Sequence, residues 1–126
     1  MVTCSSAITI SRPKTVEELF DIAEVDVKVT QVAPGAQVSA DVAIKPIGDW
    51  WDYEGVAYII TFKLWWENVE TGEKTFTRFY ETPQIDFSMI YPNPYKVPVS
   101  IEAPDVEGRW RLCGELESYT SVPVYW

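Results

Sequence analysis

The longest alternating pattern in the chain runs over residues 56–67. Its even positions are all large and apolar, whereas its odd positions mix apolar with polar residues. Side chains on a strand point to alternate faces, so the pattern predicts a long strand with one face buried and the other half covered. A helix would mix the two sets. The even-numbered residues are Val56, Tyr58, Ile60, Phe62, Leu64 and Trp66.

A hairpin is predicted directly after this strand. Glu70-Thr71-Gly72-Glu73 carries the turn signal, and residues 74–81, rich in Thr, Phe and Tyr, form the expected return strand. The sequence does not decide between two registers of this hairpin that differ by one residue. With a two-residue loop, Trp65 would lie opposite Arg78 as a cation–π pair on the outer face.

Shorter alternating segments predict further strands on both sides of this hairpin. Ala33-Pro34-Gly35-Ala36 has Pro and Gly where a type II turn requires them. Gly114 interrupts an inward-facing row and marks either a bulge or a close approach. Pro123 places the last strand at a sheet edge. The expected strands are residues 3–10, 25–30, 38–45, 85–91, 97–101, 109–117 and 119–126, with a loop over residues 91–95.

One short helix is expected near the start of the chain. Thr15, followed three residues later by Glu18, has the spacing of a capping box, and Val16, Leu19, Phe20 and Ala23 would share one helical face. The sequence therefore predicts a mainly β protein. We expect an antiparallel two-sheet sandwich of about seven to eight strands, forming one domain over residues 1–126, with residues 1–24 as an N-terminal strand and helix packed on it.

The charge balance limits the partners. The 126 residues include 10 basic and 19 acidic side chains, a net charge of −9. Such a surface repels phosphate backbones and anionic membranes, so we expect neither nucleic-acid nor membrane binding. No signal peptide or membrane-spanning run is visible, which favours a soluble intracellular or virion-associated protein. The scarcity of Asn, Gln and Met is typical of thermophilic proteins, whereas the modest number of Lys residues is not.

Two segments resemble known β-sandwich domains. VTQVAPGAQVSADVAIKPIG (residues 29–48) looks like the first two strands of immunoglobulin-like and fibronectin-type-III-like domains, and VPVSIEAPDVEGRWRLCGELES (residues 97–118) is similar to their later part. As a whole, the chain also resembles the small orphan proteins encoded by viruses of hyperthermophilic archaea in its length, its lack of His and its sandwich pattern. Both resemblances imply a binding or structural role by analogy.

The residue types argue against catalysis. Without His, Ser-His-Asp and Cys-His mechanisms and imidazole metal sites are excluded, and no phosphate-binding Gly-rich loop is present. We expect a non-enzymatic protein without a cofactor or metal. Asp49, Asp52 and Glu54 are interpreted as a solvated acidic loop, with a Ca²⁺ site as the alternative. Cys4 and Cys113 leave two alternatives, a disulfide closing a long loop or two free thiols.

Aromatic residues in loops are the main functional signal. Trp50, Trp51 and Tyr53 lie in the expected loop over residues 49–55, and Tyr91 and Tyr95 would extend their surface if the two loops meet. Such rings offer apolar faces to a protein partner or to sugars, or else fold back onto the core.

We expect a structural or protein-interaction domain, with a carbohydrate-binding module as the alternative. Two further surfaces are possible. Arg109 and Arg111 with Trp65 and Arg78 would form a second contact face, and the last strand would pair two copies into a homodimer through its exposed edge.

Overall fold

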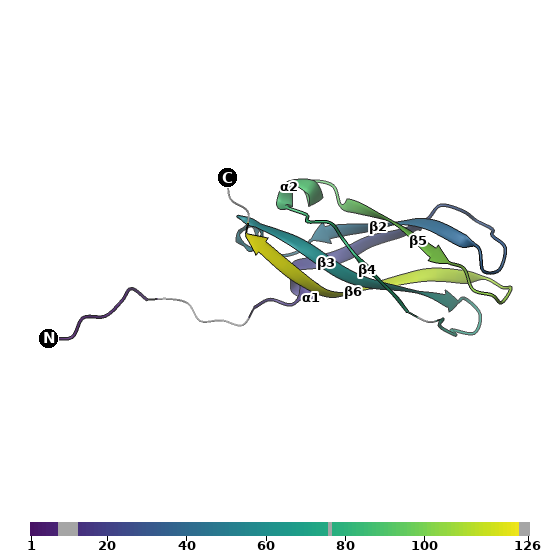
Figure 1. Cartoon of the computed structure of the whole chain (residues 1–126), viewed down its shortest axis with the longest axis horizontal. Helices are drawn as coiled ribbons and strands as arrows, with labels where there is room; N and C mark the ends of the chain where they lie inside the picture. Colours follow the sequence, from purple (N-terminus) through teal and green to yellow (C-terminus); the bar gives the residue numbers. More distant parts are fainter. Residues whose placement is uncertain (8–12, 76, 124–126) are drawn as a thin grey trace.

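The computed structural model describes residues 1–7, 13–75 and 77–123. Two antiparallel sheets of three strands each, in the orders β1-β2-β5 and β4-β3-β6, face each other (Figure 1). The mainly β, two-sheet prediction is confirmed and is compatible with a sandwich, but the described residues form six strands, not seven or eight. The elements are α1 (Val16–Leu19), β1 (Phe20–Val27), β2 (Gln37–Pro46), η1 (Trp50–Asp52), β3 (Val56–Asn68), β4 (Arg78–Glu81), α2 (Phe87–Ile90), β5 (Tyr95–Glu102) and β6 (Trp110–Pro123).

The core lies between the two sheets and follows the predicted parity of β3. Ile60, Phe62 and Leu64 are completely buried, whereas the side chains at most odd positions are partly exposed. Alternate residues of β2 meet them from the other sheet, including Val42 and Ile44. Each large apolar side chain buried in this way contributes about 1.5–3 kcal/mol, so β3 stabilises much of the fold.

The predicted helix begins as expected and ends early. The capping box is present, because the Thr15 N–H donates to Glu18 Oε1 at 3.2 Å. The chain turns into β1 already at Phe20, which pairs with Pro46 of β2. Pairing along β2 outweighs four more residues of a short helix, whose nucleation is costly. Ala23, expected on a buried helical face, is instead exposed where the β1–β2 register shifts.

The strand predicted over residues 85–91 is wrong. Only Ile85 pairs, in an isolated bridge with Tyr58, and α2 follows. Asp86 precedes this turn of helix: its backbone carbonyl accepts the Met89 N–H at 3.1 Å, and its carboxylate accepts the Ser88 hydroxyl at 2.5 Å. Short polar side chains favour such helix starts, and here this local bonding outweighs the alternation.

The end strands also differ from expectation. The strands predicted over residues 109–117 and 119–126 are one strand, β6, which lies at a sheet edge as predicted. Residues 124–126 lie outside the described part of the chain. No strand forms over residues 3–7 of the predicted N-terminal strand, and its residues 8–10 are not described.

The hairpin after β3 has a longer loop than two residues. Asn68 Oδ1 accepts the N–H groups of Glu70 and Thr71 at 2.9 and 3.0 Å, and the Gly72 N–H donates to the Asn68 carbonyl at 2.9 Å. The register therefore places Arg78 opposite Leu64.

The cation over Trp65 is the ammonium of Lys74. It lies 5.5 Å from the centre of the indole ring, on the outer face of β3. The predicted pairing of Trp65 with Arg78 in a two-residue-loop register is therefore wrong by one residue.

Candidate functional site

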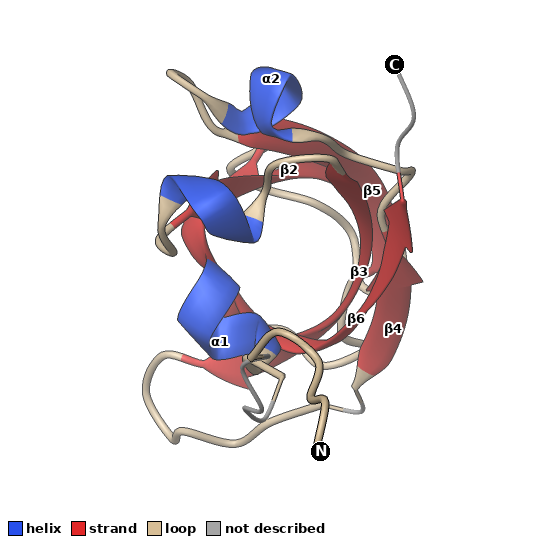
Figure 2. Cartoon of the chain, turned by 90° about the vertical axis from the view of Figure 1, so that its left-hand side faces the viewer, coloured by secondary structure: helices blue, strands red, loops and turns tan. Residues whose placement is uncertain are grey.

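Three short helical segments gather at one end of the two sheets. Figure 2 looks onto this end and shows α1 and α2 beside the turn formed by η1. Acidic residues hold η1 in place, because Asp52 Oδ2 accepts the Asp49 N–H at 2.8 Å and lies 2.8 Å from Lys14 Nζ. The pKa of Lys14 is raised by its hydrogen bond to Asp52. Among the described residues, no three His, Cys, Asp or Glu side chains converge to hold a metal ion.

Tyr53 belongs to the core, so its prediction as a surface residue is wrong. Its side chain is 3% exposed. Its hydroxyl donates to the Leu19 carbonyl at 2.5 Å and accepts the Gly48 N–H at 2.7 Å. Burial raises the pKa of this hydroxyl. Tyr53 therefore ties η1 to the end of α1, which matches the alternative that a loop ring folds back onto the core.

Trp50 and Trp51 are exposed at this same end, by 57% and 69% of their surface. The Trp50 ring lies edge-on to Phe87 of α2, with 4.8 Å between ring centres and 82° between planes. Phe87 in turn stacks on Tyr91 at 5.1 Å, and Tyr91 is 61% exposed. The two aromatic loops therefore meet, as their use as one surface requires.

We call Trp50, Trp51, Phe87 and Tyr91 the aromatic end. Phe87 joins the two loops and was missed by the sequence reasoning, because alternation had placed it in a strand. The signal that could have found it is Asp86 followed by Ser88, a polar helix-start pattern. Tyr95 is half-buried and packs against the core at the start of β5.

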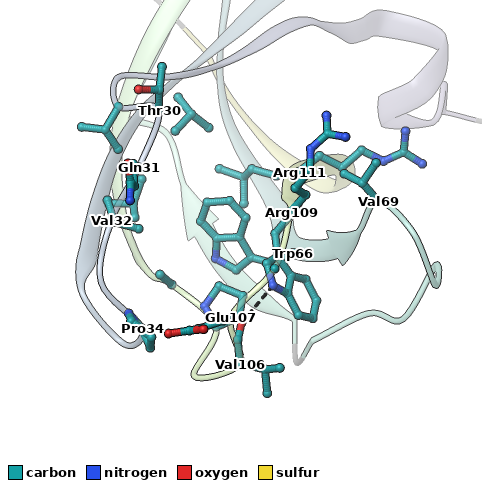
Figure 3. A pocket seen from close by; sticks show the side chains of 18 of the residues that line it. Thr30, Gln31, Val32, Pro34, Trp66, Val69, Val106, Glu107, Arg109 and Arg111 are labelled. Atoms are coloured by element: carbon teal, nitrogen blue, oxygen red, sulfur yellow. Dashed lines mark hydrogen bonds between the residues drawn. The ribbon is translucent and has the colours of Figure 1, made fainter.

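A cleft of about 750 Å³ opens at the opposite end of the sheets (Figure 3). The ends of β1 and β5, the loops after them and the beginning of β6 surround it, with Trp66 and Trp110 among its walls. The Trp66 indole donates to the Glu102 carbonyl at 2.9 Å and the Trp110 indole to the Val106 carbonyl at 3.0 Å. A hydrogen bond to the backbone thus orients each indole, and charged and polar side chains share the walls of the cleft with these rings.

Arg109 and Arg111 line this cleft, so the predicted second contact face is only partly assembled. Arg111 is tied to Glu67, whose carboxylate oxygen lies 3.3 Å from its guanidinium. That hydrogen bond holds the pKa of Glu67 below its ordinary value. Trp65 lies under Lys74 on the outer face of β3.

Both cysteines are free thiols, which is the second of the two alternatives. Cys4 is exposed in the N-terminal segment, whereas Cys113 is half-buried in β6 with its sulfur 3.4 Å from Glu67 Oε2. Burial, followed by this hydrogen bond, raises the pKa of the Cys113 thiol.

Comparison with known proteins gives this chain no family. No protein-family model, curated protein or solved structure matches it. Within the described residues, no helix has the length and apolar character needed to cross a membrane.

Proposed function

We propose that this chain is a non-enzymatic, immunoglobulin-like domain that binds a protein partner through the aromatic end. The observation that carries the proposal is the contact between two loops: Trp50 and Tyr91, both more than half exposed, are joined through Phe87. Isolated apolar residues are common on protein surfaces, whereas adjoining exposed aromatic rings mark binding surfaces. Trp and Tyr are also the residues most enriched among those that dominate binding energy.

The aromatic end is held rigid before any partner arrives. Lys14 and Asp52 fix η1 from outside, and Tyr53 anchors it from inside through two hydrogen bonds. A surface ordered in advance loses less conformational entropy on binding, so more of its contact energy appears as affinity.

The charges beside these rings indicate what the partner presents. Asp49 and Glu54 are exposed next to Trp50 and Trp51, and among the described residues Lys14 is the cation that lies within 4.0 Å of Asp49. We expect a partner with apolar pockets bordered by basic side chains, since complementary charges speed association and exclude acidic competitors.

The sugar-binding alternative has less support. Rings that bind sugars present flat faces side by side, but Trp50 and Phe87 meet at 82° and Tyr53 is buried. Phe87 and Tyr91 stack on each other. A corner of crossed rings suits the side chains of a protein better than the face of a sugar.

The immunoglobulin-like part of the proposal is supported by strand order. β1, β2 and β5 take the places of strands A, B and E, and β4, β3 and β6 those of C′, C and F. Among the described residues, nothing takes the place of strand G beside β6.

The test compares three full-length baits in chemical cross-linking and on a glycan array. The baits are wild type, Trp50→Ala/Trp51→Ala, and Phe79→Ala, a control that removes a ring 62% exposed on β4. We expect a protein cross-linked to wild type and to the control but not to the double variant. Glycan binding that disappears only in the double variant would replace the protein-partner proposal with the sugar alternative.

A further inference from the structure

β6 is a long sheet edge with an open pairing surface. It runs over 14 residues and pairs with β3 on one side, while no strand in the described part of the chain pairs with its other side. Such an edge exposes a row of backbone donors and acceptors and is a template for another strand.

The other edges of the two described sheets carry features that prevent pairing, whereas the first half of β6 does not. β4 has four residues, β5 contains Pro98, and the pairing of β1 shifts between Ile22 and Glu24. Short length, Pro and bulges all protect an edge. From Trp110 to Leu116, β6 pairs regularly with β3 and contains no Pro. This half of β6 is therefore the edge that a second strand fits best.

The hydrogen bonds of Trp66 show which backbone groups of β6 point to the open edge. The Trp66 carbonyl accepts the Thr75 N–H at 2.9 Å, and its N–H donates to Thr75 Oγ1 at 3.0 Å, on the side of β3 away from β6. Directions alternate along a strand, so Trp65 bonds toward β6, where it lies opposite Cys113. The backbone groups of the two neighbours of Cys113 therefore point to the open edge.

The charges around Cys113 are complementary to their own antiparallel copy. Arg109 and Arg111 precede Cys113 at alternate positions, and Glu115 and Glu117 follow it at alternate positions. All four charged residues are exposed. Because the order runs from basic to acidic, a second β6 that runs antiparallel brings opposite charges together. A parallel copy in the same register would oppose like charges, which is destabilising.

Centring the antiparallel pair on Cys113 places Arg111 of each copy opposite Glu115 of the other. The Arg111 guanidinium lies 3.3 Å from the Glu67 carboxylate of β3 and stays more than half exposed. Glu115 lies 3.7 Å from Lys63 Nζ and is also more than half exposed. Both side chains thus have room for a second partner. Moving the centre by two residues would oppose two copies of Arg111 or two copies of Glu115.

The contact of β6 with the other sheet lies on its inner face. A Cβ on Gly114 would lie 2.8 Å from Leu64 Cδ2 and 3.3 Å from Ile22 Cδ1, so both side chains pack against β6 from between the two sheets. β1 thus touches β6 from inside and forms no strand pair with its edge.

We infer that two copies of the chain pair through the open edges of β6, antiparallel and centred on Cys113. Two three-stranded sheets then join into one continuous sheet, and the interface closes because each copy uses the same surface. The two Cys113 residues face each other without backbone hydrogen bonds between them, with about 4.5 Å between their Cα atoms. That distance allows a disulfide, so Cys113 can report the register.

The dimer leaves the aromatic end free. Tyr119 of β6 reaches that end, where its hydroxyl donates to the Lys14 carbonyl at 2.6 Å. Cys113 lies about 20 Å away from Tyr119 along the strand. Because the two β6 strands are antiparallel, the two aromatic ends point in opposite directions. Self-association and partner binding are therefore separate properties, and either can be lost without the other.

The test is sedimentation of the full-length protein as a function of concentration, at about 0.15 M salt so that the net charge of −9 on each copy is screened. Two single variants, Arg111→Glu and Glu115→Arg, reverse one charge each, and a double variant carries both changes. Lys45→Glu is the control, because it makes the same change of charge as Arg111→Glu at an exposed position of the other sheet.

We expect wild type, the control and the double variant to form dimers. Each single variant should associate at least about tenfold more weakly, because both Arg–Glu contacts become contacts between like charges. An equal mixture of the two single variants should form heterodimers, since opposite charges then meet again. This recovery is specific to a register in which Arg111 lies opposite Glu115, and weakened folding of the single variants would not produce it.

A covalent test reads the register directly. Cys4→Ser retains Cys113 as its one thiol, and diamide should join two copies through it. Diamide accepts two electrons and the two thiol protons as the S–S bond forms. We expect a covalent dimer from Cys4→Ser and much less of it from Cys4→Ser/Arg111→Glu at the same concentration.

Three results would overturn the inference. They are a wild type that stays a single chain at about 1 mM, a mixture of the single variants that associates no better than either alone, and a Cys4→Ser dimer that diamide does not cross-link. None of the three depends on the aromatic end, so failure here would leave the proposed binding function standing.

Discussion

The substitution Tyr53→Phe tests whether Tyr53 anchors the aromatic end or belongs to its surface. It removes one hydroxyl and keeps the ring, which packs edge-on against Phe20 at 5.6 Å. The Gly48 N–H loses its acceptor, whereas the Leu19 carbonyl loses one of two donors and keeps the Ile47 N–H at 3.0 Å. A buried polar group left unpaired costs about 1–3 kcal/mol, so the loss of the acceptor at the Gly48 N–H should cost about that much. That is a large part of the roughly 5–15 kcal/mol that stabilises a domain.

Urea denaturation of wild type and Tyr53→Phe measures this loss, with an unchanged m-value showing that the same surface unfolds. Tyr80→Phe is the matched control, because its hydroxyl donates at 2.9 Å to the Ser100 carbonyl in an exposed bond. We expect the control to lose less than about 1 kcal/mol. A loss below about 0.5 kcal/mol for Tyr53→Phe would refute the anchoring role, as would lost partner binding at full stability.

Three further predictions follow from packing and burial. Gly114→Ala should destabilise by about 1–2 kcal/mol in the same urea assay, because its Cβ would lie 2.8 Å from Leu64 Cδ2, which is completely buried and has no room to move; an equal or higher stability would contradict this close packing. Cys4 should react with a thiol reagent at pH 8 much faster than Cys113, whose pKa is raised by burial; equal rates in the two single Cys→Ser variants would contradict the difference. Burial raises the pKa of Tyr58 to about 12, so its contribution to folding stability is complete below the pKa of about 10 in the unfolded chain and is lost as the pH rises towards 12. The free energy of unfolding should therefore fall more steeply between pH 10 and 12 for wild type than for Tyr58→Phe. Parallel curves for the two proteins would contradict the prediction.

The part of the fold that sequence could predict is the part set by side-chain parity. The even positions of β3 had to be buried on any sheet with one apolar face, and Phe62 and Leu64 are indeed completely buried. The type II turn could be predicted equally well, because backbone geometry requires its Gly and favours its Pro. Gly35 has φ +74°, and the Ala36 N–H donates to the Ala33 carbonyl at 3.2 Å.

The wrong predictions of helices and strands occur where a residue pattern fits both, and where local hydrogen bonds or pairing with a distant strand decide between them. Residues 87–90 alternate like a strand, but Asp86 and Ser88 start a turn of helix. Phe20 fits a helical face, but β2 supplies it with a strand partner. Neither choice between helix and strand can be made without knowing which strands lie nearby.

The sequence could predict which residues are exposed at the candidate site, but not how their side chains are arranged. Aromatic rings in two loops identified Trp50, Trp51 and Tyr91, all of which are exposed. Tyr53 looks the same in sequence, but it lies one residue beyond η1, where its hydroxyl reaches the end of α1. The cleft was not foreseeable, because it depends on how two sheet edges diverge.

The most direct test of the proposed binding function is a calorimetric titration of the purified cross-linked partner with three full-length proteins. Replacing two rings at the centre of a binding surface removes at least about 2 kcal/mol, so Trp50→Ala/Trp51→Ala should bind at least about 30-fold more weakly than wild type. Phe79→Ala, whose ring is 62% exposed on β4, should bind within about twofold of wild type. A double variant that binds as tightly as wild type while the Phe79 variant is weakened would contradict the assignment of the aromatic end as the binding surface.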